Sequence, residues 1–228
     1  MTDDPRALVA KACRILAATG HSDLIWGHAS ARSDDGSAVW LKAASWGLEE
    51  ITPDRVHLVG GDGQVLSGGG ERHREYPLHT EVMAARPDVG GVVHVHSPHA
   101  VALAASGQEL RPISHAANYF SPHGVPRFTQ TADLVLTPEL GRAVASCLGP
   151  ARAVFLVNHG VVAVGADVRE ATVAAVMLET ACEQQLLTRG FDGWPTWSSP
   201  EESEAKRSHI YSDHAVRGVW DYLERRLG

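Results

Sequence analysis

The sequence contains no long apolar segment and no cluster of basic residues. No run approaches the roughly 20 apolar residues that a membrane-spanning helix needs, and the acidic start, Met1 to Pro5, is not followed by an apolar signal core. Nucleic acids and anionic membrane surfaces attract concentrated lysine and arginine, whereas the formal net charge here is −7. We therefore expect a cytoplasmic protein that acts on a small molecule, with neither nucleic acid nor membrane as a partner.

Cysteine is scarce and shows no disulfide or ligand pattern. The three cysteines, Cys13, Cys147 and Cys182, form neither an even-numbered framework nor a closely spaced pair. Each lies among alanine, leucine, valine or glutamate in a stretch with helical character. Because free cysteine is usually buried, all three are expected to be buried thiols.

Length and composition are those of one folded globular domain. Of the 228 residues, 44% are hydrophobic and 21% are charged, which is ordinary for such domains. There is no internal repeat and no low-complexity linker. We expect residues 1–228 to form a single domain with a substantial core.

Periodicity and turn residues predict a domain that contains both strands and helices. Strands are expected at residues 24–32, 37–43, 55–59, 64–66, 92–95, 154–159 and 161–164, and helices at 5–19, 77–86, 98–104, 138–147, 168–182 and 200–227. The early strands are joined too tightly for crossover helices, which favours antiparallel pairing. The pattern predicts an α/β domain in which helices cover a largely non-parallel sheet.

Two segments lack clear periodicity. Residues 107–129 are rich in proline, glycine, histidine, serine and asparagine, and long irregular segments of this kind are often functional. Residues 190–200, which include Trp194 and Trp197, are expected to be a loop. The helix expected after Asp167 carries a stripe of small residues from Ala171 to Cys182, which permits close packing.

Histidines end two of the apolar strand-like segments. His94 and His96 close the first, and because strand side chains alternate between faces they point the same way. His159 ends the second and is followed by the permissive Gly160. A polar strand end that faces water would explain His94 and His96 by themselves. It would not explain why a second strand also ends in a histidine, His159. Imidazole is a common ligand of divalent metals, so the sequence predicts one ion held by His94, His96 and His159.

A carboxylate lies just before one of the expected helices. Glu75 precedes Pro77 by two residues, so its side chain is expected near the positive N-terminal end of that helix, which favours the ionised form. Glu75 could act as a general base or as an extra metal ligand. The alternative is a solvated acid in a polar turn, since most carboxylates are exposed.

Several motifs together resemble the class II aldolase and adducin family, and the resemblance covers nearly the whole chain. The motifs are Gly27-His28-Ala29-Ser30, Glu49 to Asp54, Glu75-Tyr76-Pro77-Leu78-His79, Arg86 to Pro98, and Asn158-His159-Gly160. The resemblance implies α/β/α layers around a mainly antiparallel central sheet. It also implies a homotetramer with active sites at subunit interfaces, which the small-residue stripe and the tryptophan-bearing C-terminal segment support.

The resemblance further implies a metal site and a catalytic acid/base. By resemblance, His94, His96 and His159 are the ligands of one divalent metal per subunit, and Glu75 is the acid/base residue beside it. Zinc is the usual metal, with Mn²⁺, Co²⁺ and Fe²⁺ as alternatives. Three histidines can also hold the iron of an oxygenase, so that activity stays open.

The chain departs from sugar-phosphate aldolases of this family where those enzymes hold phosphate. Their Gly-Asn-x-Ser, Thr-Pro-Ser-Gly and Ser-Ser-Glu stretches are replaced by Gly27-His28-Ala29-Ser30, Ala43 to Gly47, and His73-Arg74-Glu75. Arg74 adds a fork-shaped cation suited to a bidentate grip on a carboxylate. It could instead be a surface arginine or pair with a neighbouring glutamate.

A tyrosine that aldolases tend to show after a histidine is also missing, because this chain has His115-Ala116. Tyr119, His115 and His123 are the possible substitutes for that proton donor. The residues expected to contact substrate are therefore Arg74, His28, Ser30, Ser45, His115 and Tyr119.

A histidine in the Gly-His-x-Ser position is similar to the branch of the family that decarboxylates hydroxylated aromatic or pyridine carboxylates. We therefore expect a metal-dependent carbon–carbon lyase acting on a small hydroxy/oxo or hydroxy-aromatic carboxylate, with decarboxylation favoured. Retro-aldol cleavage of a sugar phosphate is the alternative. A non-catalytic, adducin-like scaffold is a further alternative, although a scaffold has no need for three histidines and Glu75 aimed at one point.

Overall fold

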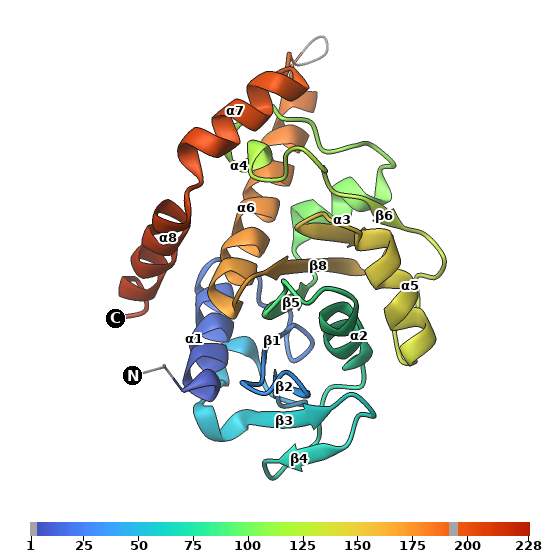
Figure 1. The fold of residues 1–228 in the computed structure, drawn as a ribbon. Helices are drawn as coiled ribbons and strands as arrows, with labels where there is room; N and C mark the ends of the chain where they lie inside the picture. The colour runs from blue at the N-terminus through green and yellow to red at the C-terminus, as the bar shows by residue number, and fades with distance from the viewer. Residues whose placement is uncertain (1–3, 192–195) are drawn as a thin grey trace.

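An eight-stranded sheet forms the centre of the protein, whose computed structural model describes residues 4–191 and 196–228 (Figure 1). The strands are β1 (His28–Arg32), β2 (Ala38–Lys42), β3 (Val56–Gly60), β4 (Val65–Ser67), β5 (Gly91–Val95), β6 (Arg127–Phe128), β7 (Ala153–Leu156) and β8 (Gly160–Gly165). Their spatial order is β4-β3-β2-β1-β5-β8-β7-β6. Only β6 and β7 pair in parallel, so the expectation of a mainly antiparallel sheet is confirmed.

Helices cover both faces of this sheet. They are α1 (Pro5–Ala18), α2 (Pro77–Ala85), α3 (Pro98–Ala105), α4 (His115–Asn118), α5 (Pro138–Leu148), α6 (Val168–Leu187), α7 (Pro200–Ile210) and α8 (Asp213–Arg225), with short 3-10 turns at Leu48–Glu50, Pro53–Arg55 and Thr188–Gly190. One apolar core joins α1, α3, α6 and α8 to one face, and a second joins α2 and α5 to the other. None of the helices in the described ranges is long and apolar enough to cross a membrane.

The sequence signals for helix starts hold in the structure. Proline occupies the first turn of α1, α2, α3, α5 and α7, where its missing N–H costs no helical hydrogen bond. The Asp4 side chain accepts from the N–H of Arg6, and Asp167 accepts from the N–H of Glu170. These caps satisfy N–H groups that have no partner inside the helix.

Some expected boundaries were wrong. The first strand begins at His28 rather than Leu24, because Leu24 has a φ of 50° and belongs to a loop. The expected final helix is two helices, since the Ser212 side chain caps a new helix start by accepting from the N–H of Ala215. The segment 107–129 contains α4 and β6. Trp194 lies outside the described residues.

Two packing expectations also need correction. Cys13 and Cys182 are buried, but Cys147 is only half-buried, because it lies at the edge of the apolar stripe of α5. The small-residue stripe of α6 is buried within this chain, where it packs into the core that also contains β5 and α3. It is therefore not a free surface for a second copy.

Close packing between β5 and the start of α6 generates a stability prediction. A Cβ on Gly91 would lie 2.4 Å from the backbone N and Cα of Val168, so Gly91→Ala should lower the free energy of unfolding by about 1–3 kcal/mol. The control is Gly218→Ala in α8, where no atom lies within 4 Å of the added Cβ and a gain of roughly 0.5–1 kcal/mol is expected. Urea denaturation measures both. Equal effects of the two substitutions would contradict this packing.

Candidate functional site

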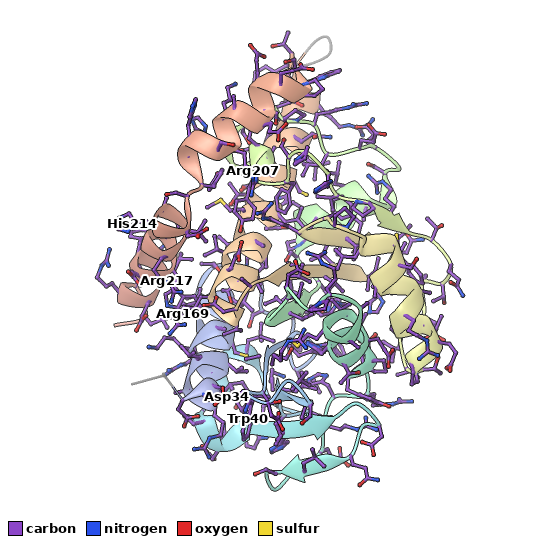
Figure 2. The ribbon with its side chains drawn as sticks, in the orientation of Figure 1. Asp34, Trp40, Arg169, Arg207, His214 and Arg217 are labelled. Atoms are coloured by element: carbon purple, nitrogen blue, oxygen red, sulfur yellow. The ribbon has the colours of Figure 1, made fainter. Side chains whose placement is uncertain are left out.

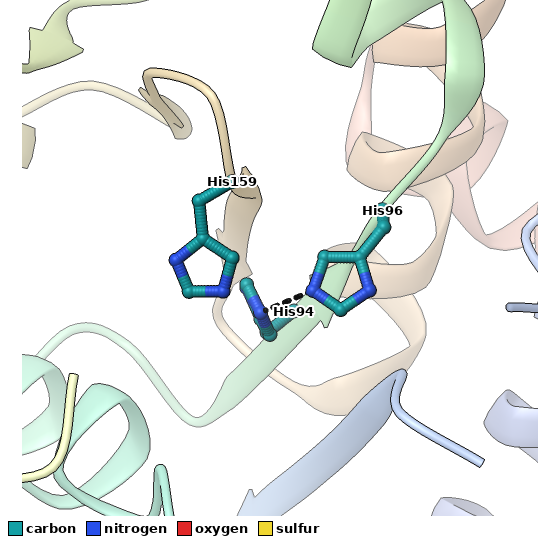
Figure 3. A group of neighbouring side chains, drawn as sticks. All are labelled: His94, His96 and His159. Atoms are coloured by element: carbon teal, nitrogen blue, oxygen red, sulfur yellow. Dashed lines mark hydrogen bonds between the residues drawn. The ribbon is translucent and has the colours of Figure 1, made fainter. Parts of the chain in front are cut away.

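Three imidazoles meet beyond the end of β5 (Figure 3). His94 lies in β5, His96 follows that strand, and His159 lies in the turn between β7 and β8. The Nε2 atoms of His94 and His96 are 3.1 Å apart, and the candidate ligand atoms of the three residues lie within 4.8 Å of one another. Two nitrogens bound tetrahedrally to zinc at about 2.0–2.1 Å would be roughly 3.3 Å apart. The cluster can therefore hold one divalent ion.

Groups behind two of these rings orient their Nε2 atoms toward the common centre. Nδ1 of His94 lies 3.0 Å from the carbonyl oxygen of Val161, and Nδ1 of His96 lies 2.8 Å from Oδ2 of Asp23. Each Nδ1–H donates to its oxygen, which fixes the tautomer and leaves Nε2 as the candidate ligand atom. Nε2 of His159 is buried and has no hydrogen-bond partner among the described residues.

The residues on either side of His159, Asn158 and Gly160, allow the backbone conformation and the close packing of its turn. Asn158 has a φ of 58°, in the left-handed region that asparagine adopts more readily than most residues. A Cβ on Gly160 would lie 2.7 Å from Cδ2 of His96 and 2.8 Å from the carbonyl oxygen of Val95. The Asn-His-Gly sequence thus allows the turn to approach β5 closely enough for His159 to join the other two rings.

Glu75 is buried against the same cluster. Its Oε2 lies 3.7 Å from Nε2 of His94, its Oε1 lies 3.7 Å from Nε2 of His159, and Oε1 accepts a 2.8 Å hydrogen bond from the N–H of Val135. Burial raises the pKa of Glu75 despite this hydrogen bond. The expectation that the start of α2 would favour the ionised form was wrong, because the carboxylate is enclosed and its backbone donor comes from elsewhere.

The imidazoles around Glu75 are neutral. Burial lowers the pKa of His94 well below its ordinary value, and it lowers the pKa of His159 to about 4. The short distances to Glu75 are therefore not ion pairs. Around Glu75 the site therefore gathers several electron-pair donors, which is the donor set that suits a divalent cation.

A second layer of polar side chains lies beside the cluster. Nδ1 of His28 lies 2.7 Å from Nε2 of His79, and Nδ1 of His79 lies 2.6 Å from Oγ of Ser30. Nε2 of His28 is buried without a partner among the described residues and lies 4.0 Å from Oε2 of Glu75. His28, Glu75 and His94 form a second group that could hold an ion. Ser30 thus lies behind His28, as a partner of His79.

A cavity of about 550 Å³ opens onto the cluster. Its walls include His96, His159 and Glu75, together with the exposed Arg74 and Ser45. Ser45 has a φ of 66°. The structure therefore brings two of the expected metal ligands, the expected acid/base residue and two of the expected substrate contacts to one cavity, with the third expected ligand, His94, buried behind them.

Three other expected residues lie elsewhere in the chain. Tyr119 is 1% exposed, and its hydroxyl lies 3.5 Å from Oε1 of Glu170. His115 is exposed on α4. His123 lines a second cavity with Arg207, a residue of α7 that is labelled in Figure 2. None of Tyr119, His115 and His123 lines the cavity at the histidine cluster of this chain.

Sequence reasoning gave no role to His73 or His79. Both are buried beside His28, with ring centroids 4.2 and 4.8 Å from the His28 ring. His79 was visible only as the end of the Glu75-Tyr76-Pro77-Leu78-His79 motif, one helical turn after Glu75. That spacing, combined with a buried helix face, is the signal that could have found it.

The sequence matches the family model described as class II aldolase and adducin N-terminal domain over residues 7–186. The chain belongs to this family. Among relatives of the class II aldolase and adducin family, it is 32% identical to a 3,4-dihydroxyphthalate decarboxylase from Rhodococcus jostii (strain RHA1), with 79% of each chain covered. This confirms the family and the decarboxylase branch that the motifs resemble.

Solved structures confirm the class II aldolase-like fold. An aldolase II superfamily protein from Pseudomonas syringae is similar, with a TM-score of 0.87 and 26% identity, covering 98% of this chain and 91% of that chain. An L-fuculose 1-phosphate aldolase from Glaciozyma antarctica PI12 has a TM-score of 0.86 at 22% identity, covering 98% of this chain and 88% of that chain. The second likeness shows the fold alone.

The hydrogen bond behind His96 generates a prediction for metal affinity. Asp23→Asn keeps the size of the side chain but removes its charge, so His96 is oriented less firmly and zinc affinity should fall about 10- to 100-fold. Competition with a fluorescent zinc chelator measures this. Asp34→Asn in an exposed turn, labelled in Figure 2, is the matched control and should keep the parent affinity. Unchanged affinity in Asp23→Asn would show that Asp23 does not orient the site.

Proposed function

We propose that this protein is a divalent-metal-dependent lyase that decarboxylates a small hydroxy-aromatic carboxylate. The observation that carries the proposal is that His96 and His159 of the histidine cluster line one cavity together with Glu75, an arginine and an apolar wall. Each of these parts meets a requirement of the reaction. A broken carbon–carbon bond leaves an electron pair that must be stabilised, a proton that must be supplied, and a substrate that must be held.

His94, His96 and His159 would hold the ion. Zinc suits three imidazole ligands, with Mn²⁺, Co²⁺ and Fe²⁺ as alternatives. Three protein ligands leave room for adjacent substrate oxygens. When bound, the metal supplies Lewis-acid stabilisation of the negative charge that develops on those oxygens.

Glu75 is the residue placed to move the proton. When carbon dioxide leaves, the electron pair of the broken bond remains on the ring carbon, and that carbon must then take up a proton. Burial raises the pKa of Glu75, which brings it closer to the range where a carboxyl group both gives and accepts a proton near neutral pH. Protonated Glu75 would donate to the ring carbon and regain its proton from solvent.

The substrate-binding walls favour an aromatic acid. Arg74 is exposed in the cavity and makes no ion pair with a carboxylate within the described ranges, so its guanidinium is available for a substrate carboxylate. Ile25, Trp26 and Leu134 add apolar surface to the same cavity, and Trp26 is 52% exposed. An aromatic ring would cover this surface, whereas a sugar phosphate would leave it unmatched. The named relative acts on an aromatic ring that carries hydroxyl and carboxylate groups.

We also propose that the protein is a homotetramer with sites at subunit interfaces. Large apolar side chains are exposed in the C-terminal part of the chain, among them Leu187, Phe191, Trp197 and Tyr222. Exposed apolar surface of this kind is typical of a surface that another copy covers. Light scattering at micromolar concentration should give four times the mass of one chain, and a monomer would contradict this part of the proposal.

Substitutions of Glu75 and Arg74 separate proton transfer from substrate binding. Glu75→Gln should keep bound metal but lose turnover by about 10²- to 10⁴-fold, the usual share of general acid–base catalysis. Arg74→Ala should lower kcat/KM most for substrates that carry the carboxylate. Arg14→Ala, on the exposed side of α1, is the control and should behave like the parent.

The assay should follow carbon dioxide and aldehyde separately, with hydroxy-aromatic carboxylates and sugar phosphates as substrates. The proposal predicts carbon dioxide from an aromatic acid. Aldehyde released efficiently from a sugar phosphate, with no carbon dioxide from any acid, would replace it with a retro-aldol activity. Oxygen consumption during turnover would point instead to an oxygenase.

A further inference from the structure

A lysine is buried behind the cavity wall without a carboxylate partner. Lys42, the last residue of β2, is 0% exposed, and within the described ranges no carboxylate oxygen lies at ion-pair distance from its Nζ. Instead, Nζ lies 3.2 Å from the carbonyl oxygen of Ile25, 3.3 Å from that of Ala43 and 3.2 Å from Nε2 of His73. An ammonium group has three N–H donors and no acceptor. These three acceptors therefore satisfy the ammonium completely.

This arrangement decides where His73 carries its hydrogen. Burial lowers the pKa of Lys42 to about 8, so the side chain is mainly an ammonium at about pH 6 to 7. An ammonium can only donate, so Nε2 of His73 accepts and is unprotonated in that range. Burial, with the nearby Lys42 adding to it, lowers the pKa of His73 to about 2, so the ring is neutral. Its one hydrogen is then on Nδ1, for which the described part of the chain provides no acceptor. His73 is one of the residues that line the cavity.

The three acceptors belong to three separate segments of the cavity wall. Ile25 lies beside Trp26, Ala43 precedes Ala44 and Ser45, and His73 precedes Arg74 and Glu75; all of these residues except Ala43 line the cavity. A single buried ammonium thus joins these three segments. Burying a charge without an opposite charge is costly, and an apolar side chain of similar length could occupy the position. The free-energy cost of burying this ammonium is explained if the site requires the positions of the three segments, and of the His73 ring, that the ammonium holds.

We infer that Lys42 is a positioning residue that holds His73 as the Nδ1–H tautomer, and that His73 donates a hydrogen bond to a carboxylate or hydroxyl oxygen of the substrate. The role toward substrate rests on the proposed function, whereas the tautomer does not. A neutral donor of this kind binds an oxygen acceptor and disfavours analogues that lack it, because the N–H would then be left unpaired. His73 would therefore contribute, together with Arg74, to the selection of substrates that carry such an oxygen.

The tautomer can be measured in the parent protein loaded with zinc. Nitrogen-15 NMR of histidine-labelled protein, assigned with a His73→Asn variant, should show Nδ1 of His73 protonated and Nε2 unprotonated across about pH 6 to 7, where Lys42 is mainly charged. A protonated Nε2 would overturn the inference. This result requires only the parent and the assignment variant, so it holds even if a Lys42 variant does not fold.

Removal of the ammonium tests the role of Lys42 itself. In Lys42→Met, Nε2 of His73 no longer receives a hydrogen bond from Nζ of residue 42. Both tautomers of the His73 ring should then be populated. Lys206→Met, on the exposed surface of α7, is the matched control and should leave the His73 signals unchanged. A folded Lys42→Met protein that keeps a single Nδ1–H tautomer would overturn the positioning role.

Two substitutions of similar size test the donor. His73→Asn keeps an N–H near the place of Nδ1, whereas His73→Leu keeps only the volume. Affinity for 3,4-dihydroxybenzoate, measured by calorimetry, should fall about 10- to 100-fold in His73→Leu and clearly less in His73→Asn. Equal losses would overturn the donor role. A parent that releases no carbon dioxide from any acid would overturn the proposed function alone, because the NMR result does not depend on turnover.

Discussion

The antiparallel pairing of β5 on both of its sides is the constraint on which the site depends. His94 is paired with His28 of β1 on one side and with Val162 of β8 on the other. A shift of one residue in either register would turn His94 from the face covered by α2 and α5 to the opposite face. The register also brings the carbonyl oxygen of Val161 to Nδ1 of His94. Sheet geometry thus places the first candidate ligand, His94, and the adjacent turns bring His96 and His159 to it.

The site lowers the stability of the folded protein when no ligand is bound. Nε2 of His28 and Nε2 of His159 are buried without hydrogen-bond partners in the described part of the chain, and each such group costs about 1–3 kcal/mol. Glu75 is buried beside neutral imidazoles, and Lys42 is buried without an opposite charge. A ligand that bound these groups would return part of that free energy and would stabilise the folded state. Polar atoms left in this way are therefore a sign of a site adapted to bind something.

Local patterns predicted the parts of the fold and site that depend on neighbours in the sequence. Strand alternation placed His94 and His96 on one side, and Pro77 marked the start of α2. What failed depends on residues far apart in the chain. The environment of Glu75 is set by burial and by Val135, sixty residues away, and the contact between Lys42 and His73 is made only by the folded chain. Tyr119 was expected to contact substrate, but in the folded chain its side chain packs in the core.

We propose above all that this chain holds one catalytic ion on three histidines. The most direct measurement is an anomalous-difference map from crystals grown with zinc. If the three histidines hold the ion, the map will show a single strong peak per chain at about 2.0–2.1 Å from Nε2 of His94, His96 and His159. The absence of a peak at that position, or a peak held by other residues, would contradict it.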